Sequence, residues 1–295
     1  SLSSKATPVL YPPTVISTPY CAMRYYAADA KDDDKLTQSL LKLAEEDRTL
    51  RVENDSENRQ TLVRGISEQH LQAVADRLKT KYNVEMKLEP PKVAYRETVR
   101  GNADVEYKHK KQSGGHGQYG HVKIKVSPSG DLTTAYEFEE TVVGGAVPKN
   151  YFPAVEKGIA EGVLAGPLAG YPVVGMHVNL YDGSSHSVDS SEAAFKTAAA
   201  MALKDALMKA DPVLLEPIAS LQVIAPEDKV GDVMGELSKR RAKIMGMNPQ
   251  DGVQVVNAEI PYATLYGLGT VLHSITGGEA SYSYEFLKYE IENKG

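Results

Sequence analysis

Glycine, lysine and histidine gather in one short stretch near the middle of the chain. Four glycines fall within residues 113–120, and cationic side chains precede them at Lys108, Lys110 and Lys111. Glycine lets a backbone approach a ligand closely, and lysine supplies positive charge. The chemistry that this combination favours is the binding of phosphate groups.

A nucleotide-binding loop is the first such site to consider. A P-loop needs Gly-Lys-Ser/Thr leading into a helix. Here the glycines precede an alternating strand pattern at residues 122–126, and Gly-Lys-Ser/Thr occurs nowhere in the chain. The stretch does not fit a nucleotide loop, so we predict no nucleotide hydrolysis by this chain alone.

Two interpretations of the glycine-rich stretch stay open. It could be a hairpin connection whose glycines only serve turns. Alternatively, its lysine, amide and tyrosine side chains provide phosphate contacts, hydrogen-bonding edges and a stacking ring, which RNA recognition uses. The side chains that would make these contacts are Lys108, Lys110, Lys111, Gln112, His116, Gln118 and Tyr119.

Three histidines, His109, His116 and His121, lie in the same stretch. Their spacings of seven and five residues, with no cysteine nearby and no carboxylate between them, do not match a zinc site. We therefore predict no metal site, and we expect these histidines to be solvated or to face RNA.

A second polar loop, residues 182–192, contains serine, histidine and aspartate within a few positions. Triad members normally converge from distant segments, and no Gly-x-Ser-x-Gly turn occurs here. A hydrolase that uses His186 and Ser191 is the enzyme alternative, and an ester assay would detect it. Asp189 is predicted to cap a helix that runs to about Lys209. His186 then has no structural role, which makes it a contact candidate.

Composition and charge restrict the class of protein. With 295 residues, 42% hydrophobic, the chain is neither disordered nor a single small module. The net charge is −6, but eight Lys or Arg against three acids give residues 92–125 a local charge of +5.

The single cysteine, Cys21, excludes a disulfide framework and predicts a cytoplasmic protein. The longest charge-free run, Gly162–Tyr181, holds four glycines and two prolines, which predicts loop and strand, not a membrane span.

The two ends of the chain repeat one order of elements. Residues 14–90 predict strand, helix, strand, strand, helix, strand, with helical apolar stripes at Leu36, Leu40 and Leu43 and again at Leu71, Val74 and Leu78. From residue 212 onward, strands at 220–224, 253–260 and 281–289 alternate with two further stripes. This is the split βαβ order of a ferredoxin-like domain. Arg240 and Arg241, after the first of these later helices, would either contact RNA or interact with the helix terminus.

The middle piece, residues 91–211, lies between two proline-containing segments that a helix cannot cross. Val122, Ile124 and Val126 alternate with lysines, which predicts a strand with an apolar face and a basic face. The pattern returns at residues 174–180, and an alanine-rich helix follows. The predicted fold class is α+β, with two ferredoxin-like domains flanking a different α+β domain.

Several long motifs, in order and without large gaps, strongly resemble the C-terminal part of bacterial elongation factor G. They include Leu43–Asp47, Val93–Thr98, Gln112–Gly120, Val143–Pro148, Leu168–Val173, Val188–Glu192, Pro212–Pro217 and Gly231–Gly235. The resemblance implies four pieces: the tail of domain II (1–12), ferredoxin-like domain III (13–90), domain IV (91–211) like ribosomal protein S5 domain 2, and ferredoxin-like domain V (212–295).

In that family, domain IV enters the ribosomal decoding site during translocation, and two loops at its end touch tRNA and mRNA. The matching positions here are 113–120 and 184–188, and His186 matches a histidine that eukaryotic and archaeal relatives modify to diphthamide. Domain V of the family contacts the GTPase-associated centre of the large subunit. The contact residues predicted for this chain are Lys108, Lys110, Lys111, Gln112, Ser113, Gly114, Gly115, His116, Gly117, Gln118, Tyr119, Ser185, His186, Arg240 and Arg241.

The resemblance also implies a larger parent protein. The chain starts at Ser1 without an initiator Met, so we expect a monomeric fragment with no cofactor of its own, whose parent binds GTP and Mg²⁺ in an N-terminal half. His116, where the family usually has Arg, and Ser185, in place of a customary aromatic residue, indicate a divergent paralogue. The alternative is a ribosome-binding or ribosome-protection factor that lacks a GTPase domain.

Overall fold

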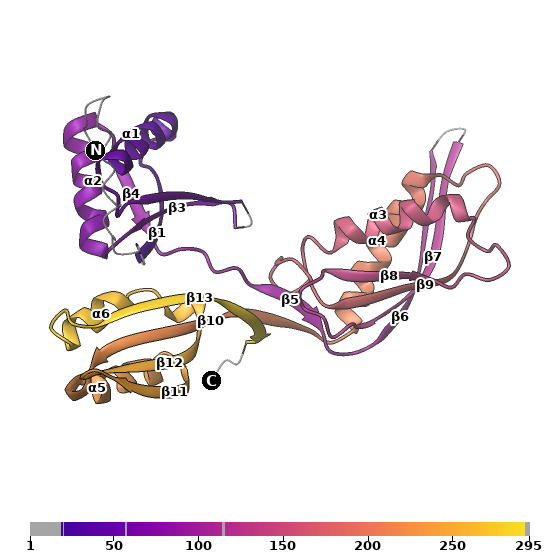
Figure 1. Cartoon of the computed structure of the whole chain (residues 1–295). Helices are drawn as coiled ribbons and strands as arrows, with labels where there is room; N and C mark the ends of the chain where they lie inside the picture. The colour runs from indigo at the N-terminus through magenta and orange to yellow at the C-terminus, as the bar shows by residue number, and fades with distance from the viewer. Residues whose placement is uncertain (1–18, 20, 57, 114–115, 293–295) are drawn as a thin grey trace, which may run out of the picture. The chain divides into compact units, whose positions relative to one another are not determined.

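The computed structural model describes residues 19, 21–56, 58–113 and 116–292. They divide into two compact units, shown in Figure 1. One unit holds the residues up to Val93 together with Ala219–Phe286, and the other holds Ala94–Ile218 together with the residues from Leu287 on. The described residues form three hydrophobic cores, two in the first unit and one in the second.

The first core belongs to a module with the predicted order of elements. These are β1 (Cys21–Ala27), α1 (Asp33–Glu46), β2 (Arg51–Asp55), β3 (Gln60–Gly65), α2 (Glu68–Tyr82) and β4 (Met86–Glu89). The sheet order β2-β3-β1-β4 is that of a ferredoxin-like fold. The apolar stripes of both helices are buried in the core, as the helical spacing predicted. Ser67 caps the start of α2, and Asn83 ends that helix in a left-handed conformation.

The third module repeats this topology. Its elements are β10 (Pro212–Pro226), α5 (Val230–Lys239), β11 (Lys243–Gln250), β12 (Val253–Pro261), α6 (Leu268–Ile275) and β13 (Ser281–Ile291). The sheet order is β11-β12-β10-β13, and β5 (Arg96–Val99) pairs with the first residues of β10. Strand β11 was missing from the sequence prediction. It is an edge strand whose Met245 and Met247 side chains are exposed, so it has no buried alternation to reveal it.

The middle module has two layers. Its elements are β6 (Ala103–Ser113), β7 (His116–Pro128), β8 (Tyr136–Glu140), α3 (Phe152–Gly162), β9 (Met176–Ser184) and α4 (Glu192–Lys209). The sheet order is β6-β7-β9-β8, with β8 parallel to β9 and the other pairs antiparallel. Residues of α3 and α4 share one core with the sheet. A Cβ on Gly158 of α3 would clash with the backbone oxygen of Lys196 in α4, so the two helices cross at close range.

Two predictions for this module need correction. Helix α3 and strand β8 were not predicted, since Pro153, Gly158 and Gly162 obscure a helix pattern in α3. The N-cap of α4 is Ser191, whose hydroxyl accepts the N–H of Ala194 at 3.2 Å, and Asp189 does not have that role. Apart from Gly162, the last residue of α3, the charge-free run Gly162–Tyr181 is loop and strand, as predicted. Over the described residues, no helix has the length and apolar character to cross a bilayer.

The described residues also form four short 3₁₀ helices. They are η1 (Ala30–Asp32), η2 (Lys149–Tyr151), η3 (Glu227–Lys229) and η4 (Tyr262–Thr264).

Candidate functional site

The structure joins the two polar segments that the sequence singled out. The β6–β7 hairpin extends beyond the rest of its sheet (Figure 1), and the loop 185–191 between β9 and α4 lies against it. A carboxylate oxygen of Asp189 accepts the N–H of Gly117 at 3.0 Å, and its backbone oxygen accepts the N–H of Tyr119 at 2.8 Å. We call the hairpin residues 110–113 and 116–119 and the loop 185–191 together the tip.

Two of the glycines serve contacts within the chain. A Cβ on Gly117 would lie 2.7 Å from Cγ of Asp189, and one on Gly120 would lie 2.5 Å from the backbone oxygen of Ala194. A side chain at Gly120 would require a shift of the backbone, and one at Gly117 would displace the Asp189 carboxylate. At Gly117 and Gly120 the absence of a side chain thus makes room for neighbouring parts of the chain, and contact of this stretch with a ligand stays a prediction. Gly114 and Gly115 lie outside the described residues.

Of the three hairpin lysines predicted as contacts, one is paired with a carboxylate and the other two are not, within the part of the chain that the structure describes. Lys108 is 3.0 Å from a carboxylate oxygen of Glu106, and the hydrogen bond with this lysine lowers the pKa of Glu106. Lys110 and Lys111 are exposed and have no partner among the described residues. Because successive strand residues point to opposite faces, these two lysines project on opposite sides of the hairpin. The uncompensated positive charge of the tip lies there.

The other predicted hairpin contacts are placed in strands. Gln112 pairs with Gly117 and Ser113 with His116 in the β6–β7 register, while the side chains of Gln112, Ser113 and His116 lie outside the described part of the structure. The side-chain oxygen of Gln118 lies 3.0 Å from Nε2 of His109.

His186 has a structural role that the sequence did not reveal. Its Nδ1 accepts the N–H groups of Asp189 at 3.1 Å and Val188 at 3.3 Å, and its own N–H donates to Oγ of Ser190 at 2.8 Å. These bonds place the hydrogen on Nε2, although an Asp189 carboxylate oxygen also lies 3.4 Å from Nδ1. The ring is half exposed and lies 6.1 Å from that of Tyr119. His186 therefore holds the loop in shape and leaves one ring edge for an external contact.

The hydrolase pair suggested by the sequence does not form. Oγ of Ser191 is used as the cap of α4, and Nδ1 of His186 faces backbone N–H groups. Ser185 and Val188, on either side of His186 and Ser187, are both exposed, and Val188 presents an apolar side chain that is 69% exposed.

His121 is buried, which corrects the expectation of a solvated or RNA-facing histidine. Its side chain is 5% exposed at the base of the tip. Nδ1 lies 2.7 Å from Oγ of Ser184, which in turn lies 2.7 Å from the hydroxyl of Tyr119. Burial lowers the pKa of His121, with Lys108 adding to this effect and Glu106 opposing it. The alternation of β7 placed His121 opposite the apolar face, but its burial depends on neighbouring strands.

The two arginines predicted as contacts lie at the end of α5. Arg240 donates to a carboxylate oxygen of Glu236 at 2.7 Å and to backbone oxygens of Thr264 and Tyr266. These bonds tie α5 to the turn before α6, so the fold itself accounts for Arg240. Arg241 is exposed and has a positive φ of 60°.

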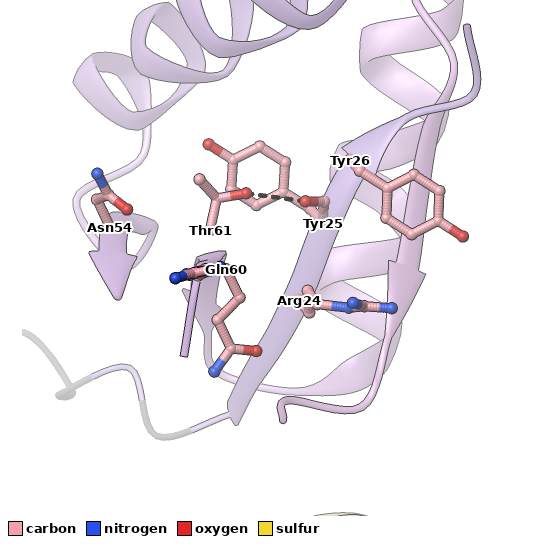
Figure 2. A pocket seen from close by; sticks show the side chains of 7 residues that line it. Arg24, Tyr25, Tyr26, Asn54, Gln60 and Thr61 are labelled. Carbon is pink, nitrogen blue, oxygen red and sulfur yellow. Dashed lines mark hydrogen bonds between the residues drawn. The ribbon is translucent and has the colours of Figure 1, made fainter. Parts of the chain in front are cut away.

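The first module contains an open pocket that the sequence did not suggest. Figure 2 shows the pocket, which measures about 470 Å³. Thr61 donates to the backbone oxygen of Tyr25 at 2.9 Å, and the hydroxyl of Tyr26 lies 2.5 Å from Glu89. Arg24 forms an ion pair with the same carboxylate, so its charge is compensated. The lining residues are Arg24, Tyr25, Tyr26, Asn54, Arg59, Gln60 and Thr61. Nowhere in the described parts do three or more His, Cys, Asp or Glu residues gather as metal ligands.

Known proteins resemble this chain in sequence and in architecture. Models of elongation factor G match in three parts: domain III over residues 16–90, domain IV over residues 91–211 and the C-terminus over residues 213–294. A protein from Thermus thermophilus whose crystal structure is known is 40% identical to this chain in sequence, and the two structures superpose with a TM-score of 0.84. The match covers 96% of this chain and 42% of that chain. The chain thus spans less than half the length of that relative.

The fold, the tip and these matches define a protein of the translation-factor class. The chain belongs to the elongation factor G family.

Proposed function

We propose that the chain is the C-terminal, ribosome-binding portion of an elongation factor G-like translational GTPase. In this proposal the middle module carries the tip into the decoding site of the small subunit and promotes the movement of tRNA and mRNA. The third module contacts the GTPase-associated centre of the large subunit. GTP and Mg²⁺ bind to a separate domain of a monomeric, cytoplasmic parent protein.

The observation that carries the proposal is the construction of the tip. Asp189 fastens two polar segments, 72 residues apart in the sequence, into one surface. Lys110 and Lys111 extend from this surface without a partner in the described structure, one on each side of the hairpin. A braced protrusion with unpaired cations on both sides suits contact with RNA phosphates on both sides.

A salt titration tests the RNA contact. The variant Lys110→Ala/Lys111→Ala is compared with Lys157→Ala/Lys204→Ala, which removes the same charge from exposed positions on α3 and α4. Ribosome binding of the chain is measured by sedimentation over a series of KCl concentrations. Each lost phosphate contact reduces the slope of log K against log salt by about 0.7–0.9, so the tip variant should lose about 1.5. Equal slopes for the two variants would contradict the proposal.

The role of His186 is best tested by asparagine. Alanine would remove the acceptor of two loop N–H bonds and so alter the loop itself. Asparagine can keep an oxygen near the position of Nδ1 and loses the Nε2 edge. We expect His186→Asn to slow single-turnover tRNA movement in the parent protein while its melting temperature stays unchanged. A normal rate in this variant would remove His186 from the contact surface.

A further inference from the structure

His121 is a buried titratable group that the proposed RNA contact does not use. It lies in β7, between Lys108 of β6 and Ser184 of β9, its neighbours across the sheet. Ser184 is the last residue of β9 and directly precedes the loop 185–191. His121 therefore lies where the hairpin and the loop of the tip leave the sheet.

The hydrogen bonds of His121 can all be made with a neutral ring. The Tyr119 hydroxyl can donate to Oγ of Ser184, and the Ser184 hydroxyl can donate to Nδ1 of His121, both at 2.7 Å. The hydrogen of the ring is then on Nε2, which lies 2.9 Å from a Glu106 oxygen, although poorly aligned for a hydrogen bond. This arrangement commits the Ser184 hydrogen to Nδ1 and its oxygen to Tyr119, so it suits positioning and not nucleophilic attack.

Protonation would disturb this arrangement in two ways. An imidazolium Nδ1 donates a hydrogen to Ser184, so the Ser184 hydroxyl would turn to the Tyr119 oxygen and both hydrogen bonds of the chain would reverse direction. The charged groups around the ring are Glu106 and Lys108 of β6, Lys123 of β7 and Asp182 of β9. Both carboxylates already pair with a lysine, at 3.0 Å for Glu106 and 2.8 Å for Asp182. A third cation in this cluster, on a ring that is almost wholly buried, is unfavourable.

We propose that His121, in its neutral form, is a positioning residue that holds Tyr119 and the start of the loop 185–191 in place, and that its protonation loosens the tip. The link to the tip is direct, because the N–H of Tyr119 is bonded to Asp189 of that loop. The proposal rests on the proposed function only in treating the tip as the RNA-contacting surface. The order of the tip can be measured without RNA.

Amide hydrogen exchange followed by NMR tests the proposal on the full chain. The amides of Gly117 and Tyr119 report the bonds to Asp189, after correction for the intrinsic effect of pH. Wild type is compared with His121→Asn, which keeps an acceptor near Nδ1 but cannot titrate, and with His177→Asn. His177 is a matched control, since it lies on the same sheet in β9 and pairs with Glu139.

We expect the protection of both amides in wild type to fall between pH 7.5 and 5.5, by up to about tenfold, the limit that the ordinary pKa of 6.5 sets at pH 5.5. His177→Asn should show the same fall, and His121→Asn should show none. A wild-type protection that does not change with pH, or an equal fall in His121→Asn, would overturn the proposal.

Ser184→Ala keeps the test decisive if His121→Asn does not fold. It leaves His121 titratable but removes the hydroxyl that links the ring to Tyr119, so the protection of both amides should be lower and should no longer respond to the titration of His121. An unchanged pH dependence in Ser184→Ala would also overturn the proposal. Failure of the proposed function is recognised separately, because the salt dependence of ribosome binding would then not respond to the lysine variants.

Discussion

A carboxylate oxygen of Glu97 accepts the backbone N–H of Ala169 at 2.8 Å, across 72 residues of sequence. The same carboxylate accepts the N–H groups of Leu168 at 2.8 Å and Tyr171 at 3.2 Å, and Glu97 is fully buried. A buried carboxylate is stable when N–H groups replace its water. Glu97 thus anchors the loop before β9, and a Cβ on Gly166 would occupy its place.

The first prediction concerns this anchor. In Glu97→Gln an amide NH₂ would face a backbone N–H, so one buried donor would lose its acceptor. We expect the free energy of unfolding to fall by about 3 kcal/mol. Urea unfolding measures it, with Glu137→Gln as the control, because Glu137 is exposed on β8. A loss equal to that of the control would show that the loop does not depend on Glu97.

Gly120 is predicted to tolerate no side chain. The Cβ of Gly120→Ala would lie 2.5 Å from the backbone oxygen and 2.6 Å from the backbone carbon of Ala194, which are not free to rotate away. The expected destabilisation is about 2–3 kcal/mol. Gly235→Ala is the contrasting variant, since open space surrounds this position in α5, and it should stabilise by about 1 kcal/mol. Urea midpoints compare the two, and similar shifts would refute the close contact.

Asp189 should affect the tip more than overall stability. Asp189→Ala removes the acceptor of the Gly117 N–H, which lies at the partly exposed end of the hairpin. We expect faster exchange of this amide and a stability loss of only about 1 kcal/mol. Asp189→Asn retains one oxygen and should restore most of the protection. Unchanged exchange in Asp189→Ala would mean that the hairpin holds its shape without the loop.

The stability of the chain should depend on pH through His121. Burial holds the pKa of this ring below its ordinary value of 6.5 in the folded state. As the pH falls, the unfolded chain therefore binds the proton first, so stability is greatest above about pH 6.5 and declines toward the folded-state pKa. Wild type should lose more stability than His121→Asn between pH 7.5 and 5.5 in urea unfolding, by up to about 1 kcal/mol. Parallel losses in the two proteins would contradict this assignment.

Cys21 gives a single-site test of the first module. Burial raises the pKa of its thiol from 9.0 to about 11. At pH 8 the thiolate is then about a hundredfold rarer than in an ordinary thiol, and disulfide reagents should react correspondingly slowly. The reaction with Ellman's reagent should accelerate when urea unfolds the chain. A fast reaction in the native protein would show that β1 does not bury this side chain.

The sequence predicted the fold class of both ferredoxin-like modules because each helix carries a buried stripe, such as Leu36, Leu40 and Leu43 in α1. It missed β11, an exposed edge strand, and α3, which contains glycine and proline. The family matches over residues 16–90, 91–211 and 213–294 agree with the resemblance read from the motifs.

The sequence identified many of the residues that form the tip, but it did not predict the contacts between them. Gly117 and Tyr119 of the glycine-rich stretch do contact the loop around His186, yet nothing local in the sequence indicates that Asp189 contacts Gly117 and does not cap α4. Burial of His121 and pairing of Lys108 with Glu106 depend on strand register across β6, β7 and β9. The spacing of residue types along the sequence does not predict such contacts between distant segments.

The close crossing of α3 and α4 limits how thick the middle module can be. Gly158 lies against the backbone of Lys196, and the buried side of α4 is mainly alanine, at Ala198, Ala199 and Ala202. Small residues let helix axes approach to the lower end of the usual 8–10 Å. The alanine methyl groups and the glycine hydrogen thus set a small distance between the two helices. A leucine at one of these positions would push the helices apart and widen the module that carries the tip.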